Sequence, residues 1–360
     1  MDRRSFLKKT ALGGGAAAAS TLAAPLYAQG NRTLTMVTTW GRGLAGVFDA
    51  AQRVADSLNA MAEGSLTVEV KGAGELVGAF EVFDAVTAGQ ADMYHGADYY
   101  FVGQHPGYAF FTSVPFGMTA QELVNWYYHG DGAGFHDELG QIFGLKSFLA
   151  GNTGAQAGGW FSKEIKGPED FNGLKFRMPG LGGKALGKLG ASVQNLPGSE
   201  VYQALASGAI DGTEWIGPWA DEKAGFQEIT KIYYTAGFHE PGAGLSIGMN
   251  REVFESLTPQ QQKMVEMACA EAHQWNLAQF LSNNSAALQR LRSSGVKTME
   301  FPNSVWDAFG QAADAVHQEN MGDELYKRMY DSYTASMKSS SAWIALSDGA
   351  YTAQRDRVLG

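Results

Sequence analysis

Residues 260–294 contain neither glycine nor proline, although the whole chain carries 46 glycines among its 360 residues. Thr258 and Pro259 precede this stretch, and a threonine at the N-cap followed by proline at the first helical position favours a helix start. The sequence therefore predicts one uninterrupted helix over residues 258–294, which at about 1.5 Å per residue would be more than about 50 Å long. We expect a helix of this length to act as a spine that faces two lobes.

Upstream of the spine, strand and helix patterns alternate, and the alternation occurs twice. Short β-rich runs are each followed by a glycine-containing loop and then by apolar residues at helical spacing. The first series predicts strands at 33–39 and 66–70 and helices at 47–61 and 80–87; after residue 150, strands are expected near 174–178 and 193–196 and helices at 181–189 and 199–206. This pattern predicts an α/β fold with two lobes, each built on a largely parallel sheet.

Charge and cysteine content exclude several classes of protein. The chain has 27 Lys and Arg against 37 Asp and Glu, a formal charge of -10. This balance argues against general electrostatic attraction to nucleic acid, so an anionic ligand needs a local basic site. Cys269 is the lone cysteine, which excludes an intramolecular disulfide and a thiolate metal cluster.

The first 28 residues resemble a twin-arginine export signal. Arg3 and Arg4 stand next to each other, and Phe6-Leu7 and an uncharged Ala- and Gly-rich stretch follow them. Ala28 offers a cleavage point, so the mature chain is expected to begin at Gln29. This predicts export to the periplasm by the twin-arginine route.

The strongest enzyme signal is a loose dinucleotide fingerprint. Gly180, Gly182 and Ala185 match G-x-G-x-x-A, and Glu200 follows at the distance expected for a ribose-binding acid. Pro179 interrupts the strand-to-helix turn, however, and the following helix ends near Gly190. A nicotinamide-dependent oxidoreductase is therefore kept as an alternative. The histidines show no metal-binding spacing, and no hydrolase motif is present.

Two segments combine glycines, polar residues and tryptophans. They are residues 151–161 (GNTGAQAGGWF) and 208–219 (GAIDGTEWIGPW). Such sequences suit a pocket in which backbone approaches a small ligand and an indole covers it. Two ordinary turns with packing tryptophans are the alternative interpretation.

The order of several motifs resembles one family. The motifs are Gly74-Glu75-Leu76, the run AVTAGQADM at 85–93, GLKFR at 173–177 and YQALASGAIDGTEW at 202–215. Together, over about residues 33–330, they resemble the extracytoplasmic solute-binding subunits of TRAP transporters, of the DctP-like type. The runs NTGAQ at 152–156, GGWF at 158–161, TEWIGP at 213–218 and DEK at 221–223 are similar to the branch that binds 2-oxo and 2-hydroxy monocarboxylates with a metal ion.

The resemblance implies a two-lobe periplasmic binding protein fold, with strands that cross between the lobes and a long spine helix. It implies no catalytic residue. Arg177 would anchor the ligand carboxylate, a role that suits a guanidinium because it makes two parallel hydrogen bonds. Gln156, Glu214 and the backbone carbonyl of Trp215 would hold a cation, with Glu240 as a further acidic ligand. Oxygen donors of this kind suit Na⁺ or Ca²⁺.

Further pocket candidates lie at or near expected strand ends. They are Thr39, Trp40, Tyr99, Tyr100, Asn152 and Trp219. The ligand would be a small organic monocarboxylate that is delivered to the TRAP membrane permease. A sensor subunit with the same fold is a second alternative to the transport role.

The expected domain limits follow from these assignments. Lobe I comprises 29–150 and about 243–257, lobe II comprises 151–242 and about 295–330, and the spine occupies 258–294. Residues 331–360 remain as a C-terminal helix bearing Tyr333, Trp343, Ile344, Leu346 and Tyr351. An exposed apolar tail predicts a homodimer through an exchanged helix, and a helix folded back on its own lobe is the alternative.

Overall fold

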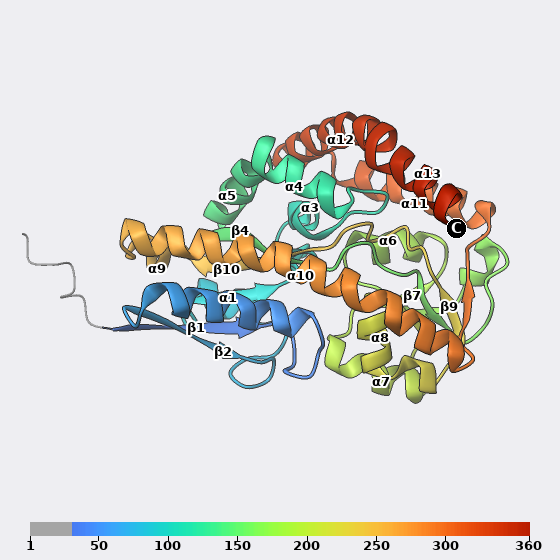
Figure 1. Ribbon diagram of the computed structural model, residues 1–360, viewed down its shortest axis with the longest axis horizontal. Coiled ribbons are helices and arrows are strands. Elements are labelled where there is room, and N and C mark those ends of the chain that lie inside the picture. The colour runs from blue at the N-terminus through green and yellow to red at the C-terminus, as the bar shows by residue number, and fades with distance from the viewer. Residues whose placement is uncertain (1–30) are drawn as a thin grey trace, which may run out of the picture.

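The computed structural model describes residues 31–360. The predicted signal segment, residues 1–28, lies outside the described residues. The described chain forms two β-sheets with helices packed around them, and one long helix runs past both sheets (Figure 1). Within residues 31–360, no helix combines the length and the apolar character needed to cross a membrane.

Lobe I is built on a five-stranded sheet of order β2-β1-β3-β10-β4. Its strands are β1 (Arg32–Thr38), β2 (Leu66–Lys71), β3 (Met93–Gly96), β4 (Leu145–Asn152) and β10 (Gly244–Asn250). β1 pairs in parallel with β2 and β3, whereas β10 runs antiparallel to β3 and β4.

Lobe II is built on a six-stranded sheet of order β11-β9-β5-β8-β6-β7. Its strands are β5 (Gly159–Phe161), β6 (Lys175–Arg177), β7 (Ser192–Gln194), β8 (Gly212–Thr213), β9 (Ile232–Tyr234) and β11 (Lys297–Met299). β6 pairs in parallel with β7 and β8, and β11 pairs in parallel with β9, but β5 runs antiparallel to both of its neighbours.

The expectation of largely parallel sheets was therefore wrong for the crossing strands. The chain passes from β4 into β5 through residues 153–158 and returns from β9 into β10 through residues 235–243. β10 begins where β4 ends, because Gly244 pairs with Asn152, and so it must run backwards relative to β4. In the same way β5 begins opposite the end of β9, with Gly159 paired to Tyr234.

The predicted spine is present as α10 (Pro259–Ser293), and it contacts both lobes. Its start is a capping box, in which Thr258 Oγ1 accepts from the Gln261 amide at 3.2 Å and Gln261 Oε1 accepts from the Thr258 amide at 3.1 Å. In the middle of the helix, buried Asn276 donates to the Gly46 carbonyl at 2.9 Å and accepts from the Asn152 amide at 3.1 Å. These contacts fix the helix to lobe I beside the first crossing.

The remaining helices pack on the sheets or on one another; α11 lies on α6 and α12 lies on α4. Close to α10 lie α1 (Val47–Ala62) in lobe I and α8 (Pro218–Ala224) in lobe II. The others are α2 (Val82–Thr87), α3 (Ala109–Thr112), α4 (Ala120–His129), α5 (Gly132–Ile142), α6 (Gly180–Lys188), α7 (Gly198–Ala206), α9 (Arg251–Glu255), α11 (Asn303–Asn320), α12 (Glu324–Ile344) and α13 (Ala350–Leu359). Burial raises the pKa of the Cys269 thiol inside α10, as expected for a structural cysteine.

The C-terminal helix begins earlier than predicted and is anchored to lobe I. Tyr333 is buried, and its hydroxyl accepts a hydrogen bond from the Met118 amide at 2.6 Å. The expectation that Tyr333 belongs to an exposed tail was wrong because α12 lays this residue against Trp126. Beyond that point Trp343, Leu346 and Tyr351 are 70%, 76% and 67% exposed. Figure 1 shows α12 passing over α3 and α4 and continuing into α13.

Candidate functional site

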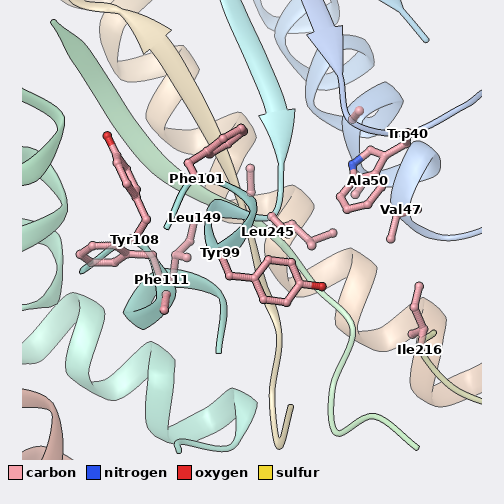
Figure 2. Close-up of a cluster of buried hydrophobic side chains, with 14 of the residues drawn as sticks. Trp40, Val47, Ala50, Tyr99, Phe101, Tyr108, Phe111, Leu149, Ile216 and Leu245 are labelled. Carbon is pink, nitrogen blue, oxygen red and sulfur yellow. The ribbon is translucent and has the colours of Figure 1, made fainter. Parts of the chain in front are cut away.

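A narrow cavity lies between the two sheets, and its walls come from both lobes. The lining residues are Trp40, Val47, Ala97, Tyr99, Tyr100, Thr112, Thr153, Gln156, Trp215, Ile216, Glu240, Ala243 and Leu245. Figure 2 shows Tyr99 extending from the side of Phe101 and Leu245 toward the side on which Trp40, Val47 and Ile216 lie. Most of these residues follow the ends of β1, β3, β8 or β9 or lie in the first crossing, so the sheets determine where their side chains meet.

Arg177, the last residue of β6, lies beside this cavity with its side chain 1% exposed. Its guanidinium is hydrogen-bonded to Glu214, donates to the Leu196 carbonyl at 3.2 Å and packs over the Trp215 ring at 5.4 Å. Burial acts to lower the pKa of Arg177, but Glu214 and then Tyr100 raise it, so the net pKa lies above its ordinary value. The site therefore holds a permanent buried positive charge.

Glu214 directly follows β8 and has two differently placed carboxylate oxygens. Oε1 accepts from Arg177, whereas Oε2 has no hydrogen-bond partner among residues 31–360. Oε2 lies 3.5 Å from Nε2 of His239, too far for a good hydrogen bond. One carboxylate oxygen is thus paired and the other is available.

Gln156 and Glu240 each present another buried oxygen of the same kind. Gln156 donates its side-chain amide to Thr153 Oγ1 at 3.0 Å, and its backbone amide binds the Glu240 carbonyl at 2.9 Å, which ties the two crossings together. Within the described chain, Gln156 Oε1 and Glu240 Oε2 have no hydrogen-bond partner. Burial, and then the charge of Glu214, raise the pKa of the Glu240 carboxyl well above its usual range.

These unsatisfied atoms indicate a missing partner. A buried polar atom without a hydrogen bond costs about 1–3 kcal/mol, so several at one place point to a bound ion, ligand or water. Amide and carboxylate oxygens are the donors that hard cations such as Na⁺ and Ca²⁺ prefer. The residues present therefore fit a cation site beside a guanidinium.

Asp221 fixes the loop that carries Glu214 and Trp215. Its fully buried carboxylate accepts from Trp160 Nε1 at 2.9 Å and from the amides of Ile216 and Gly217 at 3.0 Å each. Burial raises the pKa of Asp221 to about 7, and the bond from Trp160 is the largest effect that opposes this rise. Although Asp221 belongs to the DEK motif of the sequence, its supporting role depends on contacts that only the structure shows.

The predicted site residues fall into three groups: residues that line the cavity, residues that contact this lining, and residues buried at the ends of strands. Trp40, Tyr99, Tyr100, Gln156, Trp215 and Glu240 line the cavity, and Arg177 and Glu214 contact that lining. Thr39 and Asn152 are buried at the ends of β1 and β4, and each has one side-chain atom without a hydrogen-bond partner in residues 31–360.

Trp219 does not line the cavity. Pro218 starts α8 at this point, and the Trp219 ring packs on Phe280 of α10 at 5.5 Å. Its observed contact is therefore with the spine helix.

Sequence reasoning missed His239, Thr153 and Ile216. His239 is 2% exposed and lies next to the two acids, whereas its position in the sequence shows only that it precedes Glu240. Thr153 orients Gln156, and Ile216 closes one wall of the cavity. A His-Glu pair that follows both tryptophan- and glycine-rich segments is the one sequence signal that marks His239.

The space beside each glycine of the dinucleotide-like motif is occupied by other atoms of the protein. A methyl group on Gly180 would lie 2.8 Å from the Tyr99 ring, one on Gly182 would lie 2.7 Å from His239 Cβ, and one on Gly183 would lie 2.2 Å from the Met178 carbonyl oxygen. These glycines allow close packing of α6 and leave no cradle for a pyrophosphate.

The chain is similar to a known protein family and to individual members of it. Residues 40–323 match the family model DctP, described as bacterial extracellular solute-binding protein, family 7. A monocarboxylate 2-oxoacid-binding periplasmic protein from Nostoc is 39% identical over 317 residues, which cover 88% of this chain and 87% of the relative.

Two solved structures extend the comparison. A TRAP transporter solute-binding protein from Bordetella bronchiseptica is 30% identical with a TM-score of 0.90, covering 92% of this chain and 98% of that chain; it is a mixed-occupancy dimer with copurified calcium and picolinate. A TRAP periplasmic solute-binding protein from Pseudoalteromonas atlantica, with bound sodium and pyruvate, is 36% identical with a TM-score of 0.87, covering 89% and 98%.

The role of Asp221 gives the first prediction. Asp221→Ala should lower the free energy of unfolding by about 3 kcal/mol or more, because three buried donors lose their acceptor. The neighbouring Glu222→Ala, which breaks a surface pair with Arg290, should cost less than about 1 kcal/mol. Urea denaturation measures both variants. Equal effects of the two substitutions would show that Asp221 does not fix the loop.

Proposed function

The chain belongs to the DctP family of TRAP transporter solute-binding proteins, and on this basis we propose that it binds a small 2-oxo or 2-hydroxy monocarboxylate together with Na⁺ or Ca²⁺. The complex is then delivered to a TRAP membrane permease. Members of this family are substrate-binding receptors and not enzymes, and the comparisons give no support to the oxidoreductase alternative.

The observation that carries the proposal is the buried Arg177–Glu214 pair with unpartnered oxygens around it. Arg177 has one guanidinium nitrogen on Glu214, whereas Nη2 has only the long 3.4 Å contact to the Tyr100 hydroxyl. Nη2 is thus the donor available to a ligand carboxylate. A guanidinium is suited to this contact because its donors are fixed in a plane.

Buried charge favours a bound cation. Glu214 offsets Arg177, and burial beside Glu214 raises the pKa of Glu240 and favours its protonated form, so a monocarboxylate would bring a net charge of -1 into the buried cavity. Bound Na⁺ or Ca²⁺ would supply positive charge and a coordination position for the ligand oxygens. We propose Gln156 Oε1, Glu214, the Trp215 carbonyl and Glu240 as its ligands.

The ligand would be enclosed from both sides. Trp40, Tyr99 and Tyr100 belong to lobe I, whereas Arg177, Glu214 and Trp215 belong to lobe II. Small size is consistent with the narrow space among these aromatic side chains. Thr39 and Asn152 remain proposed ligand contacts through their unpartnered atoms, and Trp219 is proposed only as support from the spine side.

Lobe limits and export are part of the same proposal. We assign residues 29–150 and about 243–257 to lobe I and residues 151–242 and about 295–330 to lobe II, with 258–294 as the spine. Arg3 and Arg4, together with the uncharged stretch that follows, support removal of residues 1–28 after twin-arginine export to the periplasm.

Arg177→Lys tests the carboxylate anchor. Pyruvate affinity measured by calorimetry in the presence of Ca²⁺ should fall roughly 10- to 150-fold, because charged hydrogen bonds contribute about 1.5–3 kcal/mol. Lys175→Met is the control, since Lys175 lies on the same strand but is exposed. Affinity of Arg177→Lys within twofold of the unaltered protein would remove Arg177 from the site.

Cation dependence is tested with Glu214→Gln. In metal-stripped protein, added Ca²⁺ should tighten pyruvate binding by about tenfold or more, because the cation offsets buried negative charge. The gain should fall below about threefold in Glu214→Gln and stay unchanged in the surface variant Glu222→Gln. Full pyruvate affinity without any cation would contradict the cation site while leaving the family assignment intact.

We further propose that the C-terminal arm pairs two copies of the chain. Trp343, Leu346 and Tyr351 are exposed beyond the last anchor of α12, and an apolar groove of about 190 Å³ lies beside that anchor. Phe110, Phe116 and Met337 are among the residues that line it. An exchanged arm from a second copy would cover these apolar side chains.

Light scattering tests the dimer. The mature chain should have a dimeric mass, and truncation after Ser340 should give a monomer, because it removes the exposed residues and keeps buried Tyr333. Trp343→Ser combined with Leu346→Ser should also give a monomer, whereas Ile142→Ser, at a site that is also exposed, should not. A monomeric mass for the full mature chain would refute the exchanged arm.

A further inference from the structure

His239 is a buried imidazole at the centre of the candidate site. It lies in the second crossing, and neither Nδ1 nor Nε2 has a hydrogen-bond partner in the part of the chain that the structure describes. His136 and His317 are paired, with Asp98 at 2.9 Å and with the Tyr326 hydroxyl at 2.7 Å, whereas buried His273 also lacks hydrogen-bond partners among the described residues. What distinguishes His239 from His273 is its place beside two buried acids, with Nε2 at 3.5 Å from Glu214 Oε2.

Two glycines make room for this ring. A methyl group on Gly237 would lie 2.5 Å from His239 Cε1, and one on Gly182 would lie 2.7 Å from His239 Cβ. The preceding Phe238 is stacked on Phe309 at 3.9 Å, which fixes the backbone that carries His239. The imidazole is therefore held in place by packing although its nitrogens are unpaired.

The His239 imidazole and the carboxylates of Glu214 and Glu240 lie close enough together to bind one metal ion. Glu214, His239 and Glu240 each offer one donor atom, and these three atoms lie within 4.8 Å of one another. Two donors at about 2.1 Å from a tetrahedral metal ion are roughly 3.4 Å apart. His239 Nε2 and Glu214 Oε2 are separated by 3.5 Å.

The chemical class of this set differs from that of the oxygen-only site. Na⁺ and Ca²⁺ prefer oxygen ligands, whereas imidazole nitrogen with carboxylates suits divalent transition metals such as Mn²⁺ and Zn²⁺. With both acids ionised, any divalent ion and a monocarboxylate bring the charge of Arg177, Glu214 and Glu240 to zero, which disfavours Na⁺, whereas the imidazole nitrogen is what disfavours Ca²⁺.

We propose that His239 is a direct metal ligand and gives the site a preference for a divalent transition metal over Na⁺ and Ca²⁺. The inference rests on the proposed function for the two carboxylates, which both sites share. It assigns to His239 a role that the oxygen-only cation site does not require.

Calorimetry on metal-stripped protein with Zn²⁺, Mn²⁺ and Ca²⁺, each added alone, tests the preference. Zn²⁺ should bind about 100-fold more tightly than Ca²⁺, and His239→Gln should weaken Zn²⁺ by about 100-fold while changing Ca²⁺ by less than about threefold. His273→Gln is the matched control, because His273 is also buried but lies on α10 outside the donor set. Unchanged Zn²⁺ affinity in His239→Gln would overturn the proposal.

A spectroscopic measurement keeps the test independent of variant folding. X-ray absorption of the zinc-loaded, otherwise unaltered protein should show one imidazole ligand, and zinc bound by oxygen alone would overturn the proposal. Pyruvate binding is measured separately on metal-stripped protein, with Ca²⁺ or Zn²⁺ added alone. If pyruvate binds with neither cation while zinc shows the imidazole, the proposed function fails and the role of His239 stands; pyruvate binding together with zinc held by oxygen alone rejects His239 alone.

Discussion

The buried pair of Arg177 and Glu214 is the interaction on which the site depends. An ion pair without access to water must recover a large desolvation cost, so both partners need further contacts. Arg177 obtains them from the Leu196 carbonyl and the Trp215 ring, and the loop bearing Glu214 is fixed by Asp221. The pair remains incompletely satisfied because Glu214 Oε2 has no hydrogen-bond partner among the described residues. A buried carboxylate oxygen without a partner calls for an explanation such as a bound ion, ligand or water.

The topology explains how these groups meet. Each crossing between lobes places one donor in the cavity wall, Gln156 in the first and Glu240 in the second, and a backbone hydrogen bond joins the two. Asn276 of α10 is bonded both to the end of β4 and to the start of α1. The spine helix therefore fixes the place where the chain leaves lobe I to the start of α1.

Much of the fold could be predicted from local sequence patterns, whereas only part of the site could be predicted in this way. The spine was predictable because glycine and proline are missing from residues 260–294 and Thr258 caps the start. Strand direction was not predictable in this way, because the crossings reverse β5 and β10 without a local signal. Arg177 and Glu214 came from a family resemblance, and the buried contacts of Asp221 and His239 arise between segments that are distant in the sequence. Tyr333 looked like part of an exposed tail because its partner, Met118, is 215 residues away.

In the proposed site, the two oxygens of Glu214 have separate partners, which would couple the binding of the anion to the binding of the cation. Oε1 is held by Arg177 and Oε2 is directed toward His239, so a cation can reach Glu214 without breaking its pair with the guanidinium. A bound cation then lowers the electrostatic cost of a ligand carboxylate beside Arg177, and by thermodynamic linkage the carboxylate must tighten cation binding by the same factor. A monovalent ion leaves a charge of -1 when both acids are ionised and the ligand is bound, whereas a divalent ion leaves none. Since uncompensated charge is most costly in a cavity closed by Trp40, Tyr99 and Trp215, the coupling should be stronger for the divalent ion.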